Sequence, residues 1–344
     1  MKRKNPKQKE NNKTPKVSII IPTYNRCDRL GKALLSLNEL DYDKNKLEVI
    51  VVNDGSKDNT EKVVKETSKK LSYKLKYFYQ KNKKLSAARN LAINNSSGEI
   101  IVSVDDDMLF PKEWLKKLIK PLEKRDFGAV GGPSICPSFA TTFQRSVDHC
   151  MTTSFVGTGG MIGTTKKSFV KYWPRGGNMA IKKDVLDEVG LFDEKFIPSE
   201  EIDLDRRIEK AGYKLGLVKD AIVWHLPRTS LKGFLKQIFS RGFMKIQFMK
   251  RHKGTFEWLY FAPMFGVLWL TMFFLLSFIN NIASKIFTAT LVLYALILFL
   301  DAFIALKRIK KLRVLILVPF LMFMQHFTYG IGTIYGLFKK FKSK

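Results

Sequence analysis

Three consecutive aspartates, Asp105, Asp106 and Asp107, are the residues of this chain best suited to chemistry. They follow the apolar run 99–104, which reads as a strand buried on both faces, as in a parallel sheet covered by helices. Ligands of open α/β sheets bind at the carboxyl ends of such strands. Clustered carboxylates repel one another unless a cation neutralises them, and their oxygens suit Mg²⁺ or Mn²⁺. The pattern therefore predicts a divalent-metal site, the alternative being an acidic turn before the helix that begins near Pro111.

The elements that must position these acids alternate between strand and helix. Apolar runs predict strands at 17–21, 47–52, 75–79, 99–104 and 127–131, with helices beginning at Asp28, Thr60 and Ser86. Pro22 has no N–H and is expected to close the first strand, and Asp28 is expected to cap the first helix. The alternation predicts an α/β fold with a mostly parallel sheet and right-handed crossovers.

Several segments resemble, in order and spacing, the signatures of family 2 glycosyltransferases, which have the GT-A fold. At the strand ends these are Pro22-Thr23-Tyr24-Asn25, Val51 to Thr60, Ser86 to Asn90 and Asp105 to Asp107. Farther along, Gly177 to Ile181, Gly190 to Glu194, Glu200 to Asp203 and Val223 to His225 are similar to the acceptor half. The resemblance covers residues 17–226 and implies a Rossmann-like sheet with helices on both faces, followed here by a C-terminal helical membrane region.

The resemblance implies a nucleoside-diphosphate-sugar donor, linked to UDP or GDP. Its base pocket is expected to be lined by Pro22, Thr23, Tyr24 and Asn25. The carboxylate of Asp54 is expected to accept a hydrogen bond from the base, for which a pyrimidine imide N–H is a suitable donor. Lys84 departs from the pattern, because glycine often holds this loop position in the family.

The resemblance also implies roles at the diphosphate. Asp105 and Asp107 are expected to contact the ribose and the metal, while Asp106 faces the other way because side chains alternate along an extended chain. Arg89 is expected near the nucleotide, where its permanent charge is useful. His225 is a further candidate for the metal or the diphosphate, with a structural histidine as the alternative.

The acids at the start of the helix ended by Gly212 are candidates for the general base. An acceptor hydroxyl must lose its proton as it attacks the anomeric carbon, and a carboxylate at the rim of the site can accept it. The family pattern implies Glu201 as this base, with Glu200 and Asp203 as alternatives. Ordinary capping is the other interpretation, since acids in a first turn are favoured by the helix dipole.

Charge and cysteines exclude some classes of protein. The net charge of +29 invites a nucleic-acid partner. We predict none, because the cations are spread over the N-terminal tail, the helices and the flanks of apolar segments, without any nucleic-acid-binding signature. Cys27, Cys136 and Cys150 lack metal-site spacing and fit a reducing compartment.

Three apolar segments near the C-terminus, 258–279, 286–306 and 314–338, are each long enough to cross a bilayer core of about 30 Å. The loop before the third segment holds Lys307, Arg308, Lys310, Lys311 and Arg313. The positive-inside rule then predicts a multi-pass cell-membrane protein with a cytoplasmic catalytic domain. Three full spans would place the lysines after Phe338 outside, against the same rule, and a re-entrant or interfacial last segment would resolve the conflict.

The predicted organisation has four parts. They are a basic disordered tail at 1–16, the GT-A catalytic domain at 17–228, an amphipathic interfacial helix at 229–256 and a transmembrane region at 257–344. The helix carries basic residues beside apolar ones at helical spacing, which favours contact with membrane lipids. A helix packed on the catalytic domain is the alternative.

These features together predict a membrane-anchored, inverting, metal-dependent glycosyltransferase, a hexosyltransferase that uses a nucleotide sugar. The expected acceptor is a hydroxyl of a lipid-linked or cell-surface glycan or polysaccharide, because a carboxylate base helps a neutral hydroxyl and repels a phosphate. A polyprenyl-phosphate sugar synthase and a non-enzymatic membrane scaffold are the alternatives. A sugar-1-phosphate nucleotidyltransferase is disfavoured, because no glycine-rich, basic loop follows the first strand.

Overall fold

The computed structural model describes residues 14–154, 177–194, 200–251 and 258–339. Most of the predicted basic tail and the glycine-rich stretch after Phe155 lie outside these residues. The described residues form two compact units. Unit 1 contains residues up to 132, 177–194 and 201–221, and unit 2 contains 133–154, 200 and 222–339.

Unit 1 is built on one sheet of seven strands in the order β3-β2-β1-β4-β8-β6-β9. Their bounds are β1 Val17–Thr23, β2 Leu47–Asn53, β3 Lys74–Tyr79, β4 Ile100–Val104, β6 Phe127–Gly131, β8 Asn178–Lys182 and β9 Lys214–Leu217, with a short β5 at Met108–Leu109. All neighbours pair in parallel except β8, which is antiparallel to β4 and to β6. The predicted mostly parallel sheet is confirmed.

The prediction that Pro22 closes the first strand is wrong. β1 continues to Thr23 and pairs with β2 along its whole length, Pro22 lying opposite Val52. On the other side, pairing with β4 ends at Ile20. The missing N–H of Pro22 therefore falls beyond the last paired residue on that side and breaks no ladder there.

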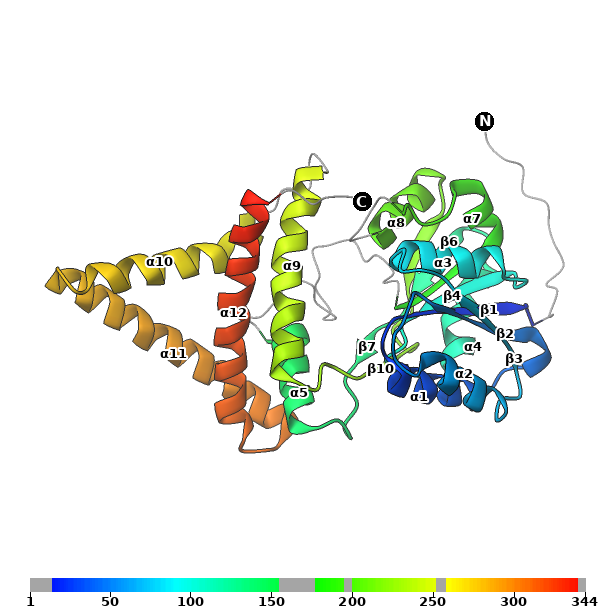
Figure 1. Ribbon diagram of the computed structural model, residues 1–344, viewed down its shortest axis with the longest axis horizontal. Helices are drawn as coiled ribbons and strands as arrows, with labels where there is room; N and C mark the ends of the chain where they lie inside the picture. The colour runs from blue at the N-terminus through cyan, green and yellow to red at the C-terminus, as the bar shows by residue number, and fades with distance from the viewer. Residues whose placement is uncertain (1–13, 155–176, 195–199, 252–257, 340–344) are drawn as a thin grey trace. The chain divides into compact units, whose positions relative to one another are not determined.

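Helices cover both faces of the sheet, with α3, α7 and α8 on one face and α1, α2 and α4 on the other (Figure 1). Their bounds are α1 Cys27–Asn38, α2 Thr60–Ser68, α3 Leu85–Asn94, α4 Trp114–Ile119, α7 Lys183–Val189 and α8 Glu200–Lys210, with 3₁₀ turns η1 Lys44–Lys46 and η2 Lys120–Glu123. The predicted buried face of α1 is confirmed, since Leu30, Ala33, Leu34 and Leu37 are its buried residues.

Asp28 does not cap α1, contrary to prediction. The helix starts one residue earlier, so Asp28 lies in its first turn, and the preceding residue makes no side-chain cap. The carboxylate of Asp58, in the loop after β2, caps the helix in part: Cys27 N donates to Asp58 Oδ2 at 3.1 Å. Asp58 also accepts from the Thr60 backbone N–H at 3.1 Å, which joins the starts of α1 and α2.

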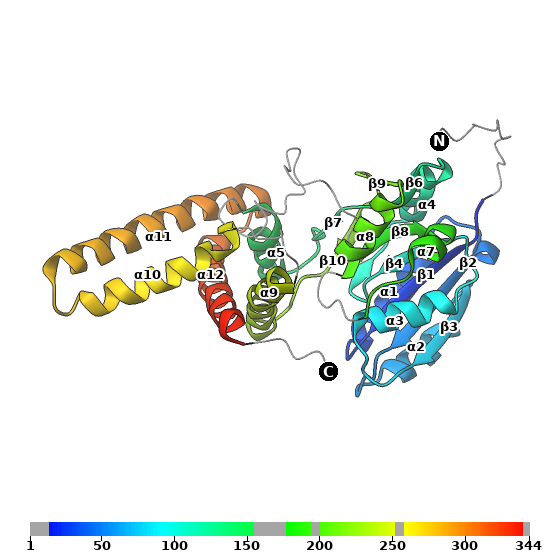
Figure 2. The same ribbon diagram turned by 90° about the horizontal axis from the view of Figure 1, so that it is seen from above.

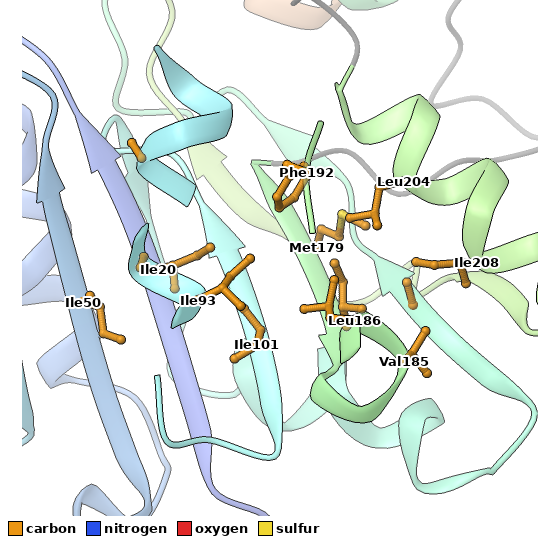
Figure 3. Packing of buried hydrophobic residues seen from close by; sticks show 14 of the residues in the cluster. Ile20, Ile50, Ile93, Ile101, Met179, Val185, Leu186, Phe192, Leu204 and Ile208 are labelled. Carbon is orange, nitrogen blue, oxygen red and sulfur yellow. The ribbon is translucent and has the colours of Figure 1, made fainter. Parts of the chain in front are cut away.

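One hydrophobic core of unit 1 lies between the sheet and α3, α7 and α8. Figure 3 shows Ile20, Ile50 and Ile101 of the strands facing Ile93 of α3, with Leu186 of α7 packed beside them. Phe192, Leu204 and Ile208 extend the same cluster toward α8. This packing fixes the helix that carries the predicted base against the strands that carry the predicted donor site.

Unit 2 is mostly helical. Its elements are β7 Ser134–Ile135, α5 Thr142–Asp148, a π-helical turn η3 His149–Thr153, β10 Val223–His225, α9 Leu231–Arg251, η4 Trp258–Phe261, α10 Ala262–Leu276, α11 Asn281–Ile309 and α12 Val314–Phe338. Three helical stretches, 258–276, 281–309 and 314–338, are long and apolar enough to cross a membrane. They match the three predicted segments closely. Figures 1 and 2 show α9 and α12 side by side, with α10 and α11 forming a hairpin that diverges from them.

Glycines let α9 and α12 approach closely. A β-carbon at Gly332 would overlap the Phe239 carbonyl oxygen, and one at Gly242 would overlap the Tyr329 carbonyl oxygen. At Gly336 it would lie 3.0 Å from the Phe243 carbonyl oxygen. The spacing of Gly332 and Gly336, which is typical of close helix packing, therefore has that role here.

Candidate active site

The carboxyl ends of β1, β2 and β4 lie at one edge of the sheet, because these strands are parallel neighbours. The segment from Pro22 to Asn25 ends β1, Asp54 follows β2, and Asp105 begins the loop after β4. Arg89 reaches the same edge from α3, as its ion pair with Asp105 shows. The structure therefore brings the predicted donor-binding residues together at the edge where α/β folds bind ligands.

The three aspartates are held by arginines. Asp106 Oδ1 accepts from Arg26 Nη1 at 2.8 Å, and the same nitrogen lies 3.1 Å from Asp107 Oδ2. Arg29 Nη1 also reaches Asp107 Oδ2, at 3.2 Å. The prediction that Asp106 faces away from Asp107 is wrong, because β4 ends at Val104 and residues 106–107 form a turn in which strand alternation does not apply.

Asp105 is set apart from the other two. Its side chain is 39% exposed, and Oδ1 lies 3.8 Å from Arg89 Nη2. A β-carbon at Gly177 would lie 2.5 Å from Asp105 Oδ2, so only glycine leaves room for this carboxylate. Although part of the side chain is exposed, desolvation by the surrounding protein raises the pKa of Asp105 to about 6; Arg89 opposes the rise, and Asp107, Asp106 and Glu201 add to it. Burial also raises the pKa of Asp106, with Arg26 acting against it.

The side chains of Arg89 and Asn90 connect α3 to the loop after α7. The Arg89 guanidinium lies 5.2 Å from the centre of the Phe192 ring, and its side chain is 2% exposed. Asn90 Nδ2 donates to the Phe192 carbonyl at 2.8 Å, and Phe192 N donates to Asn90 Oδ1 at 3.0 Å. Two of the sequence signatures that are distant in the chain are thus one structural unit.

The same loop is bound from the other side by α8. Arg207 donates from Nη1 to the Val189 carbonyl at 2.6 Å and from Nη2 to the Leu191 carbonyl at 2.7 Å. Its Nε donates to Asp203 Oδ2 at 2.9 Å. Asp203, one of the alternative bases, therefore has a structural task in orienting Arg207.

The other acids of the α8 start differ in burial. Glu200 is 4% exposed and Glu201 is partly exposed. The charge of Glu201 contributes to the raised pKa of Asp105, so this carboxylate lies within electrostatic range of the acidic cluster. Of the three candidates, Glu201 best combines access with proximity, and its role as base stays a prediction.

Asp54 organises the loop that follows β3. Its Oδ1 accepts from Gln80 Nε2 at 2.7 Å and from Lys83 N at 2.8 Å, and Oδ2 accepts from Lys84 N at 3.0 Å. The carboxylate is 6% exposed. Contact with a base stays a prediction, and the structure adds that this side chain fixes the backbone around Lys84.

The end of β1 joins the acidic cluster to the loop after β2. Thr23 Oγ1 donates to Asp106 Oδ2 at 2.7 Å. Asn25 N donates to Ser56 Oγ at 2.8 Å, and Asn25 Oδ1 accepts from Lys57 N at 2.7 Å. Pro22 is buried, whereas Tyr24 is 45% exposed and free to present its ring to a ligand.

His225 belongs to unit 2, where it ends β10, whereas Asp105 and Asp107 belong to unit 1. Its participation in a metal site stays a prediction. In unit 2, burial raises the pKa of Asp148, Arg308 opposes the rise, and His225 makes a smaller opposing contribution.

The acidic cluster fits a divalent cation that is held jointly with a ligand. Within the described ranges, no three acidic, histidine or cysteine side chains form a ready-made metal cage. Asp105 and Asp107 still offer hard carboxylate oxygens, and Mg²⁺ is usually bound by one or two carboxylates together with substrate phosphates and water. The donor set therefore suits Mg²⁺ or Mn²⁺ bound with a diphosphate.

The sequence contains signals for contacts that were not predicted. Arg26 directly follows the Pro22 to Asn25 segment as the residue before α1, and Arg29 lies three residues later in the first turn of that helix. The first strand and the acidic strand were predicted to end at the same edge of the sheet. Two cations after the first strand and three carboxylates after the other therefore indicate ion pairs. They balance much of the charge of the acidic cluster.

The mostly parallel sheet with an acid-lined carboxyl edge defines a GT-A glycosyltransferase. Residues 18–190 match the family described as glycosyl transferase family 2, and the chain belongs to this family. It is therefore an enzyme of the glycosyltransferase class, and the alternative of a non-enzymatic membrane scaffold is excluded.

Two curated relatives and one solved structure illustrate the similarity. Glycosyltransferase AglE of Haloferax volcanii is 28% identical over 68% of this chain and 74% of its own length. The dolichyl N-acetyl-alpha-D-glucosaminyl phosphate 3-beta-D-2,3-diacetamido-2,3-dideoxy-beta-D-glucuronosyltransferase of Methanococcus voltae is 25% identical over 94% of this chain and 97% of its own. The mannosyltransferase PcManGT of Pyrobaculum calidifontis, solved with GDP-Man and Mn²⁺, shares the fold with a TM-score of 0.64, 18% identity and coverage of 95% and 88%.

Proposed function

We propose that this protein is a membrane-anchored inverting glycosyltransferase that moves a sugar from a nucleoside-diphosphate sugar to a hydroxyl of a lipid-linked or cell-surface glycan. One observation carries the proposal: the carboxyl edge of the sheet brings Arg89 and Asp105 together in unit 1, the unit that also contains the candidate base Glu201. Both parts of a direct displacement, a base for the acceptor and a binding site for the leaving diphosphate, are then available.

The donor half of the proposal rests on the carboxyl edge of the sheet. Asp54 and the end of β1 would bind the base, and Arg89 with Asp105 would lie toward the ribose and diphosphate. The PcManGT structure, which has the same fold, holds GDP-Man and Mn²⁺. A divalent cation held by Asp105 and Asp107 would offset charge on the departing diphosphate.

The acceptor half rests on the chemistry of Glu201. A hydroxyl is neutral and gains about 10² to 10⁴ in rate from a positioned base. A phosphate monoester is already charged at neutral pH, so it gains nothing from a base and would be repelled by a carboxylate. The name of the Methanococcus voltae relative describes transfer to position 3 of a dolichyl-linked sugar, which is such a hydroxyl acceptor.

The membrane location in the proposal rests on the apolar helices of unit 2. Three stretches in the described residues are long and apolar enough to cross a bilayer, and cations cluster in the turn between α11 and α12. We infer a location in the cell membrane with the catalytic unit on the cytoplasmic side. A membrane acceptor and membrane lipids are then natural partners.

A panel of UDP- and GDP-sugars tests the donor. Purified protein in detergent is supplied with Mg²⁺ or Mn²⁺, and binding and hydrolysis of each sugar nucleotide are measured. We expect one sugar of the panel to bind and turn over, and Asp107→Ala to lose both properties. If no member binds with either metal, the donor assignment fails.

The variant Glu201→Gln tests the acceptor chemistry. It keeps the size of the side chain and removes its basicity, so we expect near-normal donor binding and a fall in transfer of at least about a hundredfold. Lys210→Gln, an exposed change in the last turn of the same helix, is the control and should keep its activity. Near-normal transfer by Glu201→Gln, or efficient glycosylation of bare polyprenyl phosphate by the unchanged protein, contradicts a hydroxyl acceptor.

A further inference from the structure

The helices α9 and α12 are parallel partners along most of their lengths. Gly332 of α12 meets Phe239 of α9, and one turn on Gly336 meets Phe243 and Ile246. Gln247 continues the contact, because its Nε2 donates to the Gly336 carbonyl at 2.7 Å and to the Lys339 carbonyl at 2.8 Å. Both views show the two helices side by side (Figures 1 and 2). Backbone-to-backbone contact of this kind leaves no room for lipid between the two helices. Both helices must therefore lie in the same part of the membrane, either across the hydrocarbon core or in the interface.

Four of the five exposed side chains that the structure describes in α9 are cations. The five are Lys232, Lys236, Ser240, Arg241 and Lys250, distributed from the first turn to the last. Lys250 donates to the Leu337 carbonyl at 2.6 Å, at the far end of α12. No carboxylate occurs in α9. Cations facing lipid are costly inside a bilayer, and a helix with such a face lies in the interface.

We infer that α12 does not cross the bilayer, and that the chain crosses it twice, through α10 and α11. If α12 crossed, the close glycine contacts would carry α9 and its cations through the hydrocarbon beside it. The pair instead lies in the membrane interface, with the cations of α9 near anionic headgroups and the apolar side of α12 toward the acyl chains. That apolar side consists of Ile316, Phe320, Phe323, Phe327 and Ile331, all at least 38% exposed.

The burial of the three helices agrees with this division. Met264 is the one buried residue of α10, and large apolar side chains such as Phe265, Trp269 and Leu275 are exposed around it. In α12 the buried residues form a long stripe from Val314 to Gly336. The hairpin of α10 and α11 diverges from α12 in both views (Figures 1 and 2), so α12 is inclined to the normal of a bilayer that the hairpin crosses.

Two crossings also remove the conflict over charge. Among the described residues all candidate spans follow residue 257, so unit 1 and α9 lie on one side of the bilayer. The hairpin leaves and returns to that side, and α12 then stays on it. The cations between Lys307 and Arg313 and the lysines after Phe338 are thereby on the same side, as the positive-inside rule requires.

Sidedness of three introduced cysteines tests this topology in the full chain. Lys70→Cys marks the catalytic unit, Ile279→Cys marks the tip of the hairpin, and Lys344→Cys marks the C-terminus. Membrane-impermeant PEG-maleimide is applied to spheroplasts before and after permeabilisation, and each added thiol is counted as a mass step above the native cysteines. We expect Lys344→Cys to react under the same condition as Lys70→Cys, and Ile279→Cys under the opposite one. A C-terminus that reacts together with Ile279→Cys overturns the inference. The readout is independent of sugar transfer, so it does not depend on the proposed function.

Membrane depth gives a second test that does not rely on the ends of the chain. Spin labels are placed on exposed positions of α12, at Ile316, Phe323 and Ile331, and at Leu293 of α11 as a depth standard. In vesicles with anionic lipids we expect the three α12 labels to share one shallow depth and Leu293 to lie near the bilayer centre. A maximum of depth at Phe323, with shallower positions on both sides, would mean that α12 crosses.

Discussion

At the scale of single residues, Lys84 has an unusual backbone. Its φ is 79° and its ψ is 175°, a region that is populated almost only by glycine. The conformation is held by the carboxylate of Asp54, which accepts from both Lys83 N and Lys84 N. The backbone of this loop is therefore strained at Lys84, the position where the family often has glycine.

We expect Lys84→Gly to stabilise unit 1 by about 1 kcal/mol. Relief of a strained backbone is worth roughly 1–3 kcal/mol, and the greater freedom of glycine in the unfolded chain removes about 0.5–1 kcal/mol of this. Thermal unfolding in detergent measures the change. Lys83→Gly is the matched control, because Lys83 has no positive φ and should lose stability. Equal losses in the two variants would contradict the strain.

The acids of the site could be predicted from the sequence, and their partners could not. Three carboxylates after a buried strand are a local pattern, and so are Glu200 and Glu201 at a helix start. The ion pairs of Arg26 and Arg29 join residues about 80 apart, and the turn at residues 106–107 aims Asp106 at Arg26. Such contacts depend on packing between elements, about which sequence periodicity says nothing.

At the scale of elements, α8 contains a buried acid that the ligand chemistry does not use. Asp205 is fully buried, and neither of its carboxylate oxygens has a hydrogen-bond partner among the described residues. Burial raises its pKa to about 9, with contributions from the charges of Glu201 and Glu209 one turn away on either side. Asp205 is therefore protonated in the folded protein at neutral pH.

This carboxyl should make stability depend on pH in a specific direction. The folded pKa of about 9 exceeds the ordinary 3.8, so the folded state binds the extra proton. Its contribution is complete below about pH 4 and declines as the pH rises toward 9. Asp205→Asn is neutral at every pH, and we expect it to be more stable than the unchanged protein at pH 8 by about 1–3 kcal/mol, with a smaller gain at pH 6.

Unfolding curves at pH 6, 7, 8 and 9 measure this effect. Asp187→Asn, an exposed change on α7, controls for the loss of one negative charge and should keep the pH dependence of the unchanged protein. A constant difference between Asp205→Asn and the unchanged protein across these pH values would show that Asp205 ionises without penalty.

A helix or strand could be predicted where one of its faces is apolar. The end of an element could be predicted where a backbone rule applies. The buried face of α1, the strand 127–131 and the end of α8 before Gly212, whose φ is +90°, follow such rules. The errors at Pro22 and Asp28 have one cause. Each rule was applied to a residue by itself, whereas the neighbouring strand and the Asp58 loop decide what the backbone needs there.

At the scale of the whole chain, the order of a catalytic sheet followed by apolar helices was predictable, and the contents of unit 2 were not. Residues 133–154 lie inside the predicted catalytic domain and pack with the apolar helices. Val147 and Cys150 join Phe234 of α9, Leu298 of α11 and Val318 of α12 in one buried cluster. The sequence offered one signal for this contact, because Asp301 is an acid inside an apolar helix and such a residue needs a partner.

That partner is His149 in η3, 152 residues away in the chain. Its Nε2 lies 3.1 Å from Asp301 Oδ2, and both side chains are completely buried. The neighbouring Cys150 carbonyl accepts from Gln325 Nε2 of α12 at 3.3 Å. Because the two buried side chains contact each other, removal of either one takes a polar contact away from the other.

We expect His149→Ala and Asp301→Ala each to destabilise unit 2 by about 3–5 kcal/mol, since each breaks a completely buried polar contact. The double variant His149→Phe with Asp301→Leu removes both groups and fills the space, so it should lose far less than the two single changes together. Thermal unfolding in detergent compares these variants with the unchanged protein, and His149→Ala combined with Asp301→Ala completes a double-mutant cycle that measures the coupling. Thr288→Ala, an exposed change on the same helix, should have little effect. If Asp301→Ala is as mild as Thr288→Ala, or if the double variant loses the full sum, the pair does not hold η3 to α11, and the apolar cluster alone must do so.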